Sequence, residues 1–232
     1  MTEQHLVIGA RGGIGRALHA KLAAQGHRVL AVQRAAGDWP GLNLGEDQSI
    51  AELAEALRQA TVGHLHGIYF CSGLLHAEGI RPERRMADLD SAAFDQLMRV
   101  NALGPLRLLA ALLPLLDRQQ PSRIAAISAR VGSIADNRLG GWTSYRCSKA
   151  ALNMGLRNAA IELNRTHPQA RVTLFHPGTT DTALSKPFQR NVKPDKLFSP
   201  ERAARQFLEV LDQRPDSREA LFLDWAGKPV AF

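Results

Sequence analysis

Tyr145 and Lys149 are the two side chains whose types and spacing best suit proton transfer. They open a segment, residues 144–165, that predicts a long helix, and a four-residue spacing places both side chains on one helical face. A phenol alone titrates near ~10, too high for acid–base work at neutral pH. Because a neighbouring ammonium favours the phenolate, we expect Lys149 to lower the pKa of Tyr145. Tyr145 could then give a proton to a carbonyl oxygen or take one from an alcohol.

Two other polar residues are candidate partners of this pair. Asn101 lies inside a second predicted helix, residues 91–116, four residues before Pro105. Because proline has no N–H, the carbonyl of Asn101 loses its helical partner and could hold a water that contacts Lys149 in a proton relay. A simple proline kink is the alternative. Ser128 ends the strand-like segment 123–128, where its hydroxyl could bind a substrate oxygen.

A glycine-rich loop joins the first strand-like segment, residues 5–9, to a helical pattern that ends at Gly26. Glycine permits a tight turn and lets a phosphate approach the backbone, and the following helix presents free N–H groups and the positive end of its dipole. This context predicts a dinucleotide-binding loop rather than an ordinary glycine-rich turn. The loop residues expected to contact the dinucleotide are Gly9, Arg11, Gly13, Ile14 and Gly15.

Arg34 predicts which dinucleotide is bound. It follows the second strand-like segment, about twenty residues past the loop, where an NAD-binding protein places an acid for the ribose hydroxyls. Arg34 and Arg11 can bracket a 2′-phosphate through charge-assisted hydrogen bonds, although both could simply be solvated. We therefore expect NADP(H), with NAD(H) the less favoured alternative. An oxidised nicotinamide would add its charge to that of Lys149 in lowering the pKa of Tyr145.

A second turn lies after the strand-like segment 171–175. Pro177 and Gly178 direct the chain across the carboxyl edge of the predicted sheet, where ligands bind in such folds. Thr180 and Thr182 could then bond the nicotinamide carboxamide. We expect His176, which precedes the turn, to be structural rather than catalytic.

Short apolar segments alternate with helical ones along the whole chain. This pattern predicts a doubly wound α/β fold with a parallel sheet of about seven strands and helices on both faces. No linker divides the chain, so we expect one domain over residues 1–232. Residues 179–199 form a long irregular segment between a strand and a helix, which predicts a lid over the substrate.

Composition limits the possible partners. The net charge of +7 and pI near 10.0 suit a phosphorylated cofactor. Lys and Arg are scattered rather than clustered with aromatic residues, so we expect no nucleic-acid partner. The two cysteines have neither metal-site nor disulfide spacing, and the most apolar stretch, residues 102–116, is short for a bilayer and carries two prolines. We expect a cytoplasmic protein with no bound metal and no membrane association.

In this combination and order, the motifs resemble those of the short-chain dehydrogenase/reductase family over nearly the whole chain. The stretch from Ser128 through the segment around Tyr145 is most similar to the C-factor and Sniffer-type carbonyl reductase branch. The resemblance implies a Rossmann fold and matches Asn101, Tyr145 and Lys149 to catalytic positions. It also places Asn43, Leu44 and Gly73 at the cofactor, with Pro177, Gly178, Thr180 and Thr182 in the turn described above.

The chain departs from the family pattern at three places. The family's Asn-Asn-Ala-Gly reads Phe-Cys-Ser-Gly over residues 70–73, and its adenine-contacting Asp appears as Asn43. Its catalytic serine falls on Ala129, so Ser128 or Ser133 must supply the hydroxyl that binds the substrate oxygen.

These observations predict an NADP(H)-dependent oxidoreductase. We expect it to transfer hydride between the nicotinamide and a carbonyl or secondary alcohol of a small, largely apolar substrate. The alternative is a dinucleotide-binding regulatory protein of the same fold with little turnover. The apolar content of the two long helices, and the resemblance, favour a homodimer or homotetramer.

Overall fold

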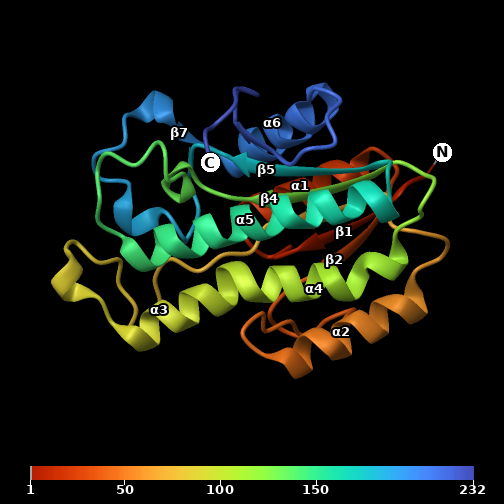
Figure 1. The fold of residues 1–232 in the computed structure, drawn as a ribbon, viewed down its shortest axis with the longest axis horizontal. Coiled ribbons are helices and arrows are strands. Elements are labelled where there is room, and N and C mark those ends of the chain that lie inside the picture. Colours follow the sequence, from red (N-terminus) through yellow and green to blue (C-terminus); the bar gives the residue numbers. More distant parts are fainter. Residues whose placement is uncertain (1) are drawn as a thin grey trace.

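The predicted strand segments form one parallel sheet in the computed structural model, which describes residues 2–232 (Figure 1). The strand order is β2-β1-β3-β4-β5-β8, so the chain winds outward from β1 in both directions. The strands are β1 (Gln4–Ile8), β2 (Arg28–Val32), β3 (Gly67–Phe70), β4 (Ser122–Ile127), β5 (Ala170–His176) and β8 (Leu221–Asp224). The helices are α1 (Gly13–Ala24), α2 (Asp47–Ala60), α3 (Ser91–Met98), α4 (Gly104–Leu112), α5 (Thr143–Thr166) and α6 (Pro200–Gln213).

Helices cover both faces of the sheet, as expected for a doubly wound fold. Helices α2, α4 and α5 pack Leu53, Leu108 and Leu156 against one face (Figure 1). Helices α1 and α6 pack Leu18 and Phe207 against the other. Because both faces are buried, the strands are apolar runs without alternation, which is why they could be recognised in the sequence.

The main sheet has six strands among the described residues, which agrees with the expected number of about seven to within one strand. The segment between β2 and α2 contains Gly37, Pro40 and Gly41 and has no continuous apolar run. Its Leu42 N–H donates to the carbonyl of Gln33 at 2.9 Å. The segment therefore folds back on the end of β2 instead of extending the sheet.

The predicted helix over residues 91–116 is present but changes its winding in the middle. Helix α3 passes into a π-helical turn, Arg99–Leu103, before α4 begins at Gly104. Pro105 stands at the first turn of α4, where its missing N–H perturbs the helical ladder. The stretch Ser91–Leu115 is long and apolar enough to span a membrane by length and composition. Its Leu108, Leu109 and Leu112 are instead buried against the sheet, as in a core helix of a soluble fold.

The two ends of the segment 179–199 are held together by a short sheet of their own. Strands β6 (Thr179–Thr180) and β7 (Leu197–Phe198) pair in parallel and close it into a loop. Phe198 is buried, with the Arg202 guanidinium 3.7 Å from its ring centroid and the Trp225 ring 5.1 Å away. The loop between β6 and β7 therefore starts and ends on a fixed support.

Candidate active site

A cavity of about 1100 Å³ lies at the carboxyl ends of the strands, where the connections after the neighbouring strands β1 and β3 lead to opposite faces of the sheet. This is the crevice in which doubly wound folds bind their ligands. Fifteen of the predicted site residues border it: Gly9, Arg11, Gly13, Ile14, Arg34, Asn43, Leu44, Gly73, Ser128, Tyr145, Lys149, Pro177, Gly178, Thr180 and Thr182. Gly15 and Asn101 do not.

The glycine loop is shaped by close contacts. Gly9 has a φ of +85°, and a Cβ there would lie 2.8 Å from the backbone N of Ser72. At Gly13 a Cβ would lie 2.7 Å from Cγ2 of Thr182. Gly15 faces away from the cavity, and a Cβ there would collide with the carbonyl of Gly9. Its role is therefore to let α1 pack against the loop rather than to contact a ligand.

Tyr145 and Lys149 lie one turn apart at the start of α5, with Lys149 Nζ 5.9 Å from the Tyr145 ring centroid. The two residues are 7% and 3% exposed, and Nζ donates to the carbonyl of Ile127 at 3.0 Å. Burial lowers the pKa of Lys149 to about 8 and raises the pKa of Tyr145 above its usual range. The expected lowering of the Tyr145 pKa is therefore not produced by the protein alone, because desolvation disfavours both charged forms.

Asn101 lies in the π-helical turn, and its side chain forms hydrogen bonds with the backbone of the segment after β3. Oδ1 accepts the N–H of Leu74 and Nδ2 donates to the carbonyl of Leu74, both at 2.7 Å. Nδ2 also lies 3.0 Å from Oγ of Ser148. A Cβ at Gly73 would lie 3.6 Å from Lys149 Nζ and 3.7 Å from Asn101 Oδ1, so these groups meet across Gly73. The sequence predicted the proximity of Asn101 to Lys149 but missed this clamp on the segment after β3.

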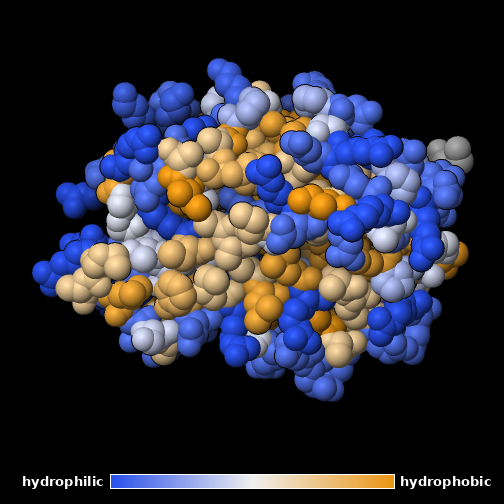
Figure 2. Space-filling view, viewed as in Figure 1, coloured by the Kyte–Doolittle hydropathy of each residue, from blue (hydrophilic) through white to orange (hydrophobic). Residues whose placement is uncertain are grey.

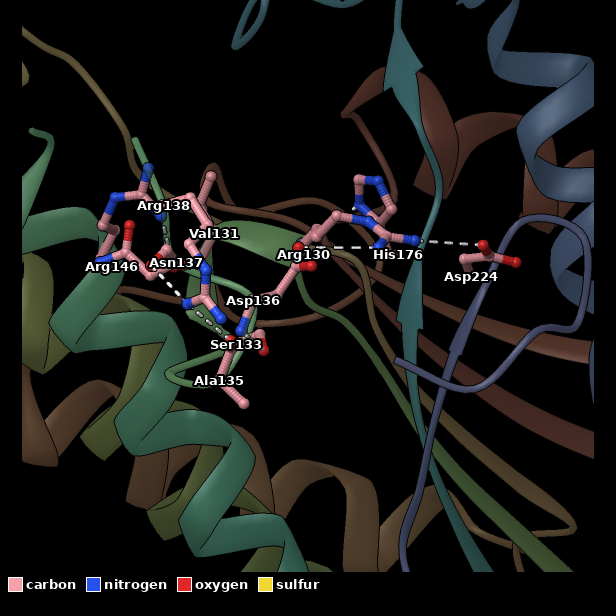
Figure 3. A network of polar contacts seen from close by, with 10 residues as sticks. All are labelled: Arg130, Val131, Ser133, Ala135, Asp136, Asn137, Arg138, Arg146, His176 and Asp224. Carbon is pink, nitrogen blue, oxygen red and sulfur yellow. Dashed lines mark hydrogen bonds and ion pairs between the residues drawn. The ribbon is translucent and has the colours of Figure 1, made fainter. Parts of the chain in front are cut away.

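The hydroxyls of Ser128 and Ser133 both have protein partners. Ser128 is buried, and its Oγ donates to Oδ1 of Asn153 at 2.6 Å. Oγ of Ser133 accepts the N–H of Asp136 at 3.0 Å in the loop drawn in Figure 3, and Ser133 does not border the cavity. Ala129 does border the cavity, and it packs in the same cluster as Tyr145.

His176 belongs to a polar network at the ends of β5 and β8 (Figure 3). Its Nδ1 accepts the N–H of Arg130 at 3.3 Å, and the Arg130 guanidinium contacts Asp224 at 3.3 Å and Asp136 at 3.6 Å. Mainly because it is buried, His176 has its pKa lowered to about 4, so the ring is neutral at physiological pH. These contacts fit the expected structural role, because they tie the loop after β4 to the sheet edge.

Glu83 is a site-supporting residue that the sequence analysis missed. It lies in the loop between β3 and α3, is 5% exposed, and accepts the N–H of Ser144 at 3.2 Å and the Ser144 hydroxyl. Its own carbonyl accepts the N–H of Trp142 at 2.7 Å. Trp142, at φ +55°, precedes α5 and makes no side-chain cap. Glu83 therefore caps the helix that begins with Tyr145, and no local sequence signal marks a cap supplied from 61 residues away.

The wall of the cavity near Tyr145 is mainly apolar and partly aromatic. Trp142 lies 4.9 Å from Phe188, and His76 lies 5.7 Å from Phe188, between ring centroids. His76 also lies within 3.1 Å of the carbonyl of Leu184, which joins the segment after β3 to the 179–199 loop. The residues of this wall are Leu74, Leu75, His76, Ala129, Val131, Trp142, Leu184, Phe188 and Val192.

Comparisons with known proteins agree with this geometry. Residues 39–193, more than half of the chain, match the family model of short chain dehydrogenase. The chain is 30% identical to 1-hydroxy-2-glutathionyl-2-methyl-3-butene dehydrogenase of Rhodococcus sp. (strain AD45), over 95% of this chain and 98% of that protein. It is 36% identical to C-signal of Myxococcus xanthus, over 62% of this chain and 82% of that protein.

Solved structures show the same fold. A putative short-chain dehydrogenase/reductase from Burkholderia multivorans with bound NADP superimposes with a TM-score of 0.83 and 26% identity, over all of both chains. Carbonyl reductase Sniffer of D. melanogaster superimposes with a TM-score of 0.79 and 18% identity, also over all of both chains. The chain therefore belongs to the short-chain dehydrogenase/reductase family. It is an NAD(P)-dependent oxidoreductase that acts on small molecules, and its similarity to C-signal and the Sniffer fold agrees with the predicted branch.

Proposed function

We propose that this protein is an NADP(H)-dependent reductase that interconverts a carbonyl group and a secondary alcohol on a small, largely apolar substrate. The observation that carries the proposal is that Tyr145, Lys149 and the glycine loop border one cavity. Carbonyl reduction needs a dinucleotide that delivers hydride to the carbonyl carbon and a proton donor within reach of the carbonyl oxygen of the same bound substrate. The chain supplies the binding loop for the first and the phenol for the second.

The residues around the cavity fit a dinucleotide. The glycine loop leaves no Cβ where a pyrophosphate would approach the start of α1. Thr180 is 4% exposed, and among the described residues its Oγ1 has no hydrogen-bond partner, so it can bond a carboxamide. Arg11 and Arg34 are exposed, border the cavity, and form no ion pair within residues 2–232. Both guanidiniums are therefore available for a 2′-phosphate, which favours NADP(H) over NAD(H).

The bound nicotinamide would supply or accept the hydride. Tyr145 donates a proton to the substrate oxygen in reduction and takes it back in oxidation. Lys149, whose pKa of about 8 lies near the operating pH, stabilises the phenolate and holds a proton to replace the one that is lost. Asn101 keeps the segment after β3 in place beside Lys149. Ser128 is the hydroxyl proposed for the substrate oxygen, and it must first give up its bond to Asn153.

The apolar wall supports an apolar substrate, and residues 179–199 are the proposed lid. Leu184, Phe188 and Val192 of this segment face the cavity. The segment's lysine and arginine residues do not border the cavity, and Lys186 pairs with Asp181 at 3.7 Å.

Cofactor choice is tested by calorimetric binding of NADPH and NADH to wild type, Arg34→Glu and Arg218→Glu. Arg218 is exposed and does not border the cavity. Its variant is the control, because it changes the net charge by the same amount as Arg34→Glu. We expect Arg34→Glu to weaken NADPH binding at least about tenfold and to improve NADH binding, because a carboxylate repels the 2′-phosphate and accepts from ribose hydroxyls. Arg218→Glu should match wild type. Equal, weak binding of both cofactors by wild type would contradict the assignment.

Turnover is tested by oxidation of NADPH across a panel of aldehydes and ketones, with wild type and Tyr145→Phe. We expect Tyr145→Phe to lower kcat about 10²–10⁴-fold while NADPH affinity stays within about twofold, because the phenol acts only on the substrate oxygen. The second candidate function is a dinucleotide-binding regulator, favoured by Ala129 where a hydroxyl is expected. Tight NADPH binding by wild type without turnover of any carbonyl would support that alternative.

A further inference from the structure

Half of the histidines gather at the edge of the sheet opposite the cavity. His5 is in β1, His27 precedes β2, and His64 and His66 precede β3; these are four of the eight histidines in the chain. Because the strands are parallel, their first residues meet at one edge. The His5 ring centroid lies 4.9 Å from that of His27 and 6.5 Å from that of His66. The proposed oxidoreductase chemistry uses none of them.

Three side chains at this edge converge on one point. A carboxylate oxygen of Glu3 and one ring nitrogen each of His5 and His27 lie within 4.8 Å of one another. The shortest separation, His5 Nε2 to Glu3 Oε2, is 3.1 Å. In a tetrahedral zinc site with bonds near 2.0–2.1 Å, neighbouring ligand atoms are about 3.3 Å apart. The His5–Glu3 pair already has that spacing, and the His27 ring nitrogen lies within 4.8 Å of both atoms.

His5 carries the strongest argument, because it is 2% exposed and its Nε2 is unsatisfied. Glu3 Oε2 lies 3.1 Å from this nitrogen, but the contact is not a hydrogen bond among the described residues. A buried ring nitrogen without a hydrogen-bond partner lowers the stability of the fold. A cation placed on the lone pair of this nitrogen would satisfy it and could also bind the Glu3 carboxylate.

The surroundings of His5 resemble the support of a metal ligand. Its other ring nitrogen, Nδ1, lies 3.4 Å from the hydroxyl of Tyr69. A ligating histidine usually engages its second nitrogen in this way, which fixes the ring orientation and tautomer. A Cβ at Gly67 would lie 2.5 Å from His5 Nδ1 and 2.5 Å from the Tyr69 hydroxyl oxygen, so the glycine makes room for this pair.

We propose that Glu3, His5 and His27 form a zinc site that ties the start of β1 to the start of β2, with water as the fourth ligand. Two imidazoles and one carboxylate suit Zn²⁺ better than Mg²⁺ or Ca²⁺, which prefer oxygen. Binding replaces the long hydrogen bond, 3.3 Å, from Glu3 N–H to His27 Nδ1. Arg123 is a cation whose charge acts on His5, and Asp212 pairs with it at 2.6 Å. Glu3, whose side chain is 46% exposed, gives the ion a path from solvent.

The test is calorimetric titration of the metal-stripped full chain with Zn²⁺. The variants are Glu3→Gln and His27→Gln, with His19→Gln on α1 as the matched histidine control outside the cluster. We expect one Zn²⁺ per chain in wild type and His19→Gln, and at least tenfold weaker binding in Glu3→Gln and His27→Gln. NADPH affinity should be the same in all four proteins, because the cluster lies at the opposite edge of the sheet from the cavity.

Thermal unfolding gives a second readout. Zn²⁺ should raise the Tm of wild type and His19→Gln, since a ligand that binds the folded state stabilises it, and should leave His27→Gln unchanged. The proposal is overturned if wild type binds no Zn²⁺, or if both cluster variants bind it as tightly as wild type does. If His27→Gln fails to fold, the exposed Glu3→Gln variant decides by itself. Because the readout is metal binding, failure here leaves the proposed reductase function untouched.

Discussion

At position 129 a methyl group borders the cavity where a hydroxyl would contact a substrate oxygen. Ser128 is next to it in sequence, but its hydroxyl is bonded to Asn153 at 2.6 Å. Successive side chains at the end of a strand point in opposite directions, so the two positions are not equivalent. The hydroxyl of Ser128 reaches a substrate only after that bond is broken.

We therefore predict that Ala129→Ser raises kcat/KM by about tenfold or more, since a positioned donor to the reacting oxygen contributes on that scale or above. Steady-state kinetics with the best carbonyl from the panel measures it. Ser128→Ala should lower kcat in the wild-type background and change it less than about twofold beside Ala129→Ser. Unchanged or reduced activity in Ala129→Ser would show that another group polarises the carbonyl.

Lys149 predicts a pH-dependent difference in stability. Burial shifts its pKa from 10.5 to about 8, so below pH 8 the folded protein carries a buried charge that the unfolded chain leaves in water. Between pH 8 and 10.5 the unfolded chain holds a proton that the folded protein has released, and stability from this group rises with pH. At about 1.4 kcal/mol for each pKa unit, the change amounts to about 3 kcal/mol.

Lys149→Met removes this dependence. We expect its advantage in free energy of unfolding over wild type to shrink by about 2–3 kcal/mol between pH 7 and pH 10. Urea unfolding at the two pH values, without cofactor, measures the difference. A constant offset between the two proteins would mean that Lys149 is better solvated than its 3% exposure indicates.

At the scale of elements, the start of α5 depends on the loop that carries Glu83. The Glu83 carboxylate receives two donors of Ser144, and Tyr145 is the next residue. We predict that Glu83→Ala destabilises the fold by about 1–3 kcal/mol, because buried donors lose their acceptor. It should also lower kcat more than it weakens NADPH binding.

Glu83→Gln keeps an acceptor oxygen, so it should recover most of both losses. Glu78→Ala, an exposed change in the same loop, should match wild type. Urea unfolding and steady-state kinetics on the three variants measure these effects. If Glu83→Ala lowered stability and left kcat intact, the cap would serve folding alone.

The sequence predicted those elements whose signals are local. The apolar strands, the glycine loop and the Tyr145–Lys149 spacing each lie within a few residues, and the structure confirms the fold that they predict. The Asn101 clamp on Leu74 and the Glu83 cap depend on contacts between distant segments. The spacing of apolar residues along the sequence gives no signal for such contacts. The sequence also did not indicate that burial raises the pKa of Tyr145 in the protein without cofactor, because burial depends on the whole core.

At the scale of the molecule, apolar side chains gather on the face covered by α4 and α5 (Figure 2). Met154 and Ile161 of α5 are 59% and 51% exposed, and Leu103 is 45% exposed. Exposed apolar patches of this kind mark protein contacts. The homo-oligomer expected from the sequence would use this face.

We predict that Met154→Glu combined with Ile161→Glu yields monomers at concentrations where wild type is dimeric or tetrameric, because charge at the centre of an apolar interface opposes association. Light scattering after size-exclusion chromatography measures the mass. Val62→Glu, a change at an apolar side chain that is 75% exposed on a loop away from α5, is the control. Wild type that is monomeric throughout would contradict the prediction.

Several contacts that shape the site end on main-chain atoms. Asn101 bonds the N–H and carbonyl of Leu74, and Lys149 bonds the carbonyl of Ile127. Every residue offers these groups, so the partner positions can drift in sequence while the architecture is kept. The tetrapeptide at residues 70–73, which directly precedes Leu74, follows the family pattern only at the glycine beside Lys149. Distant relatives are therefore better sought by the clamping side chains than by the residues they hold.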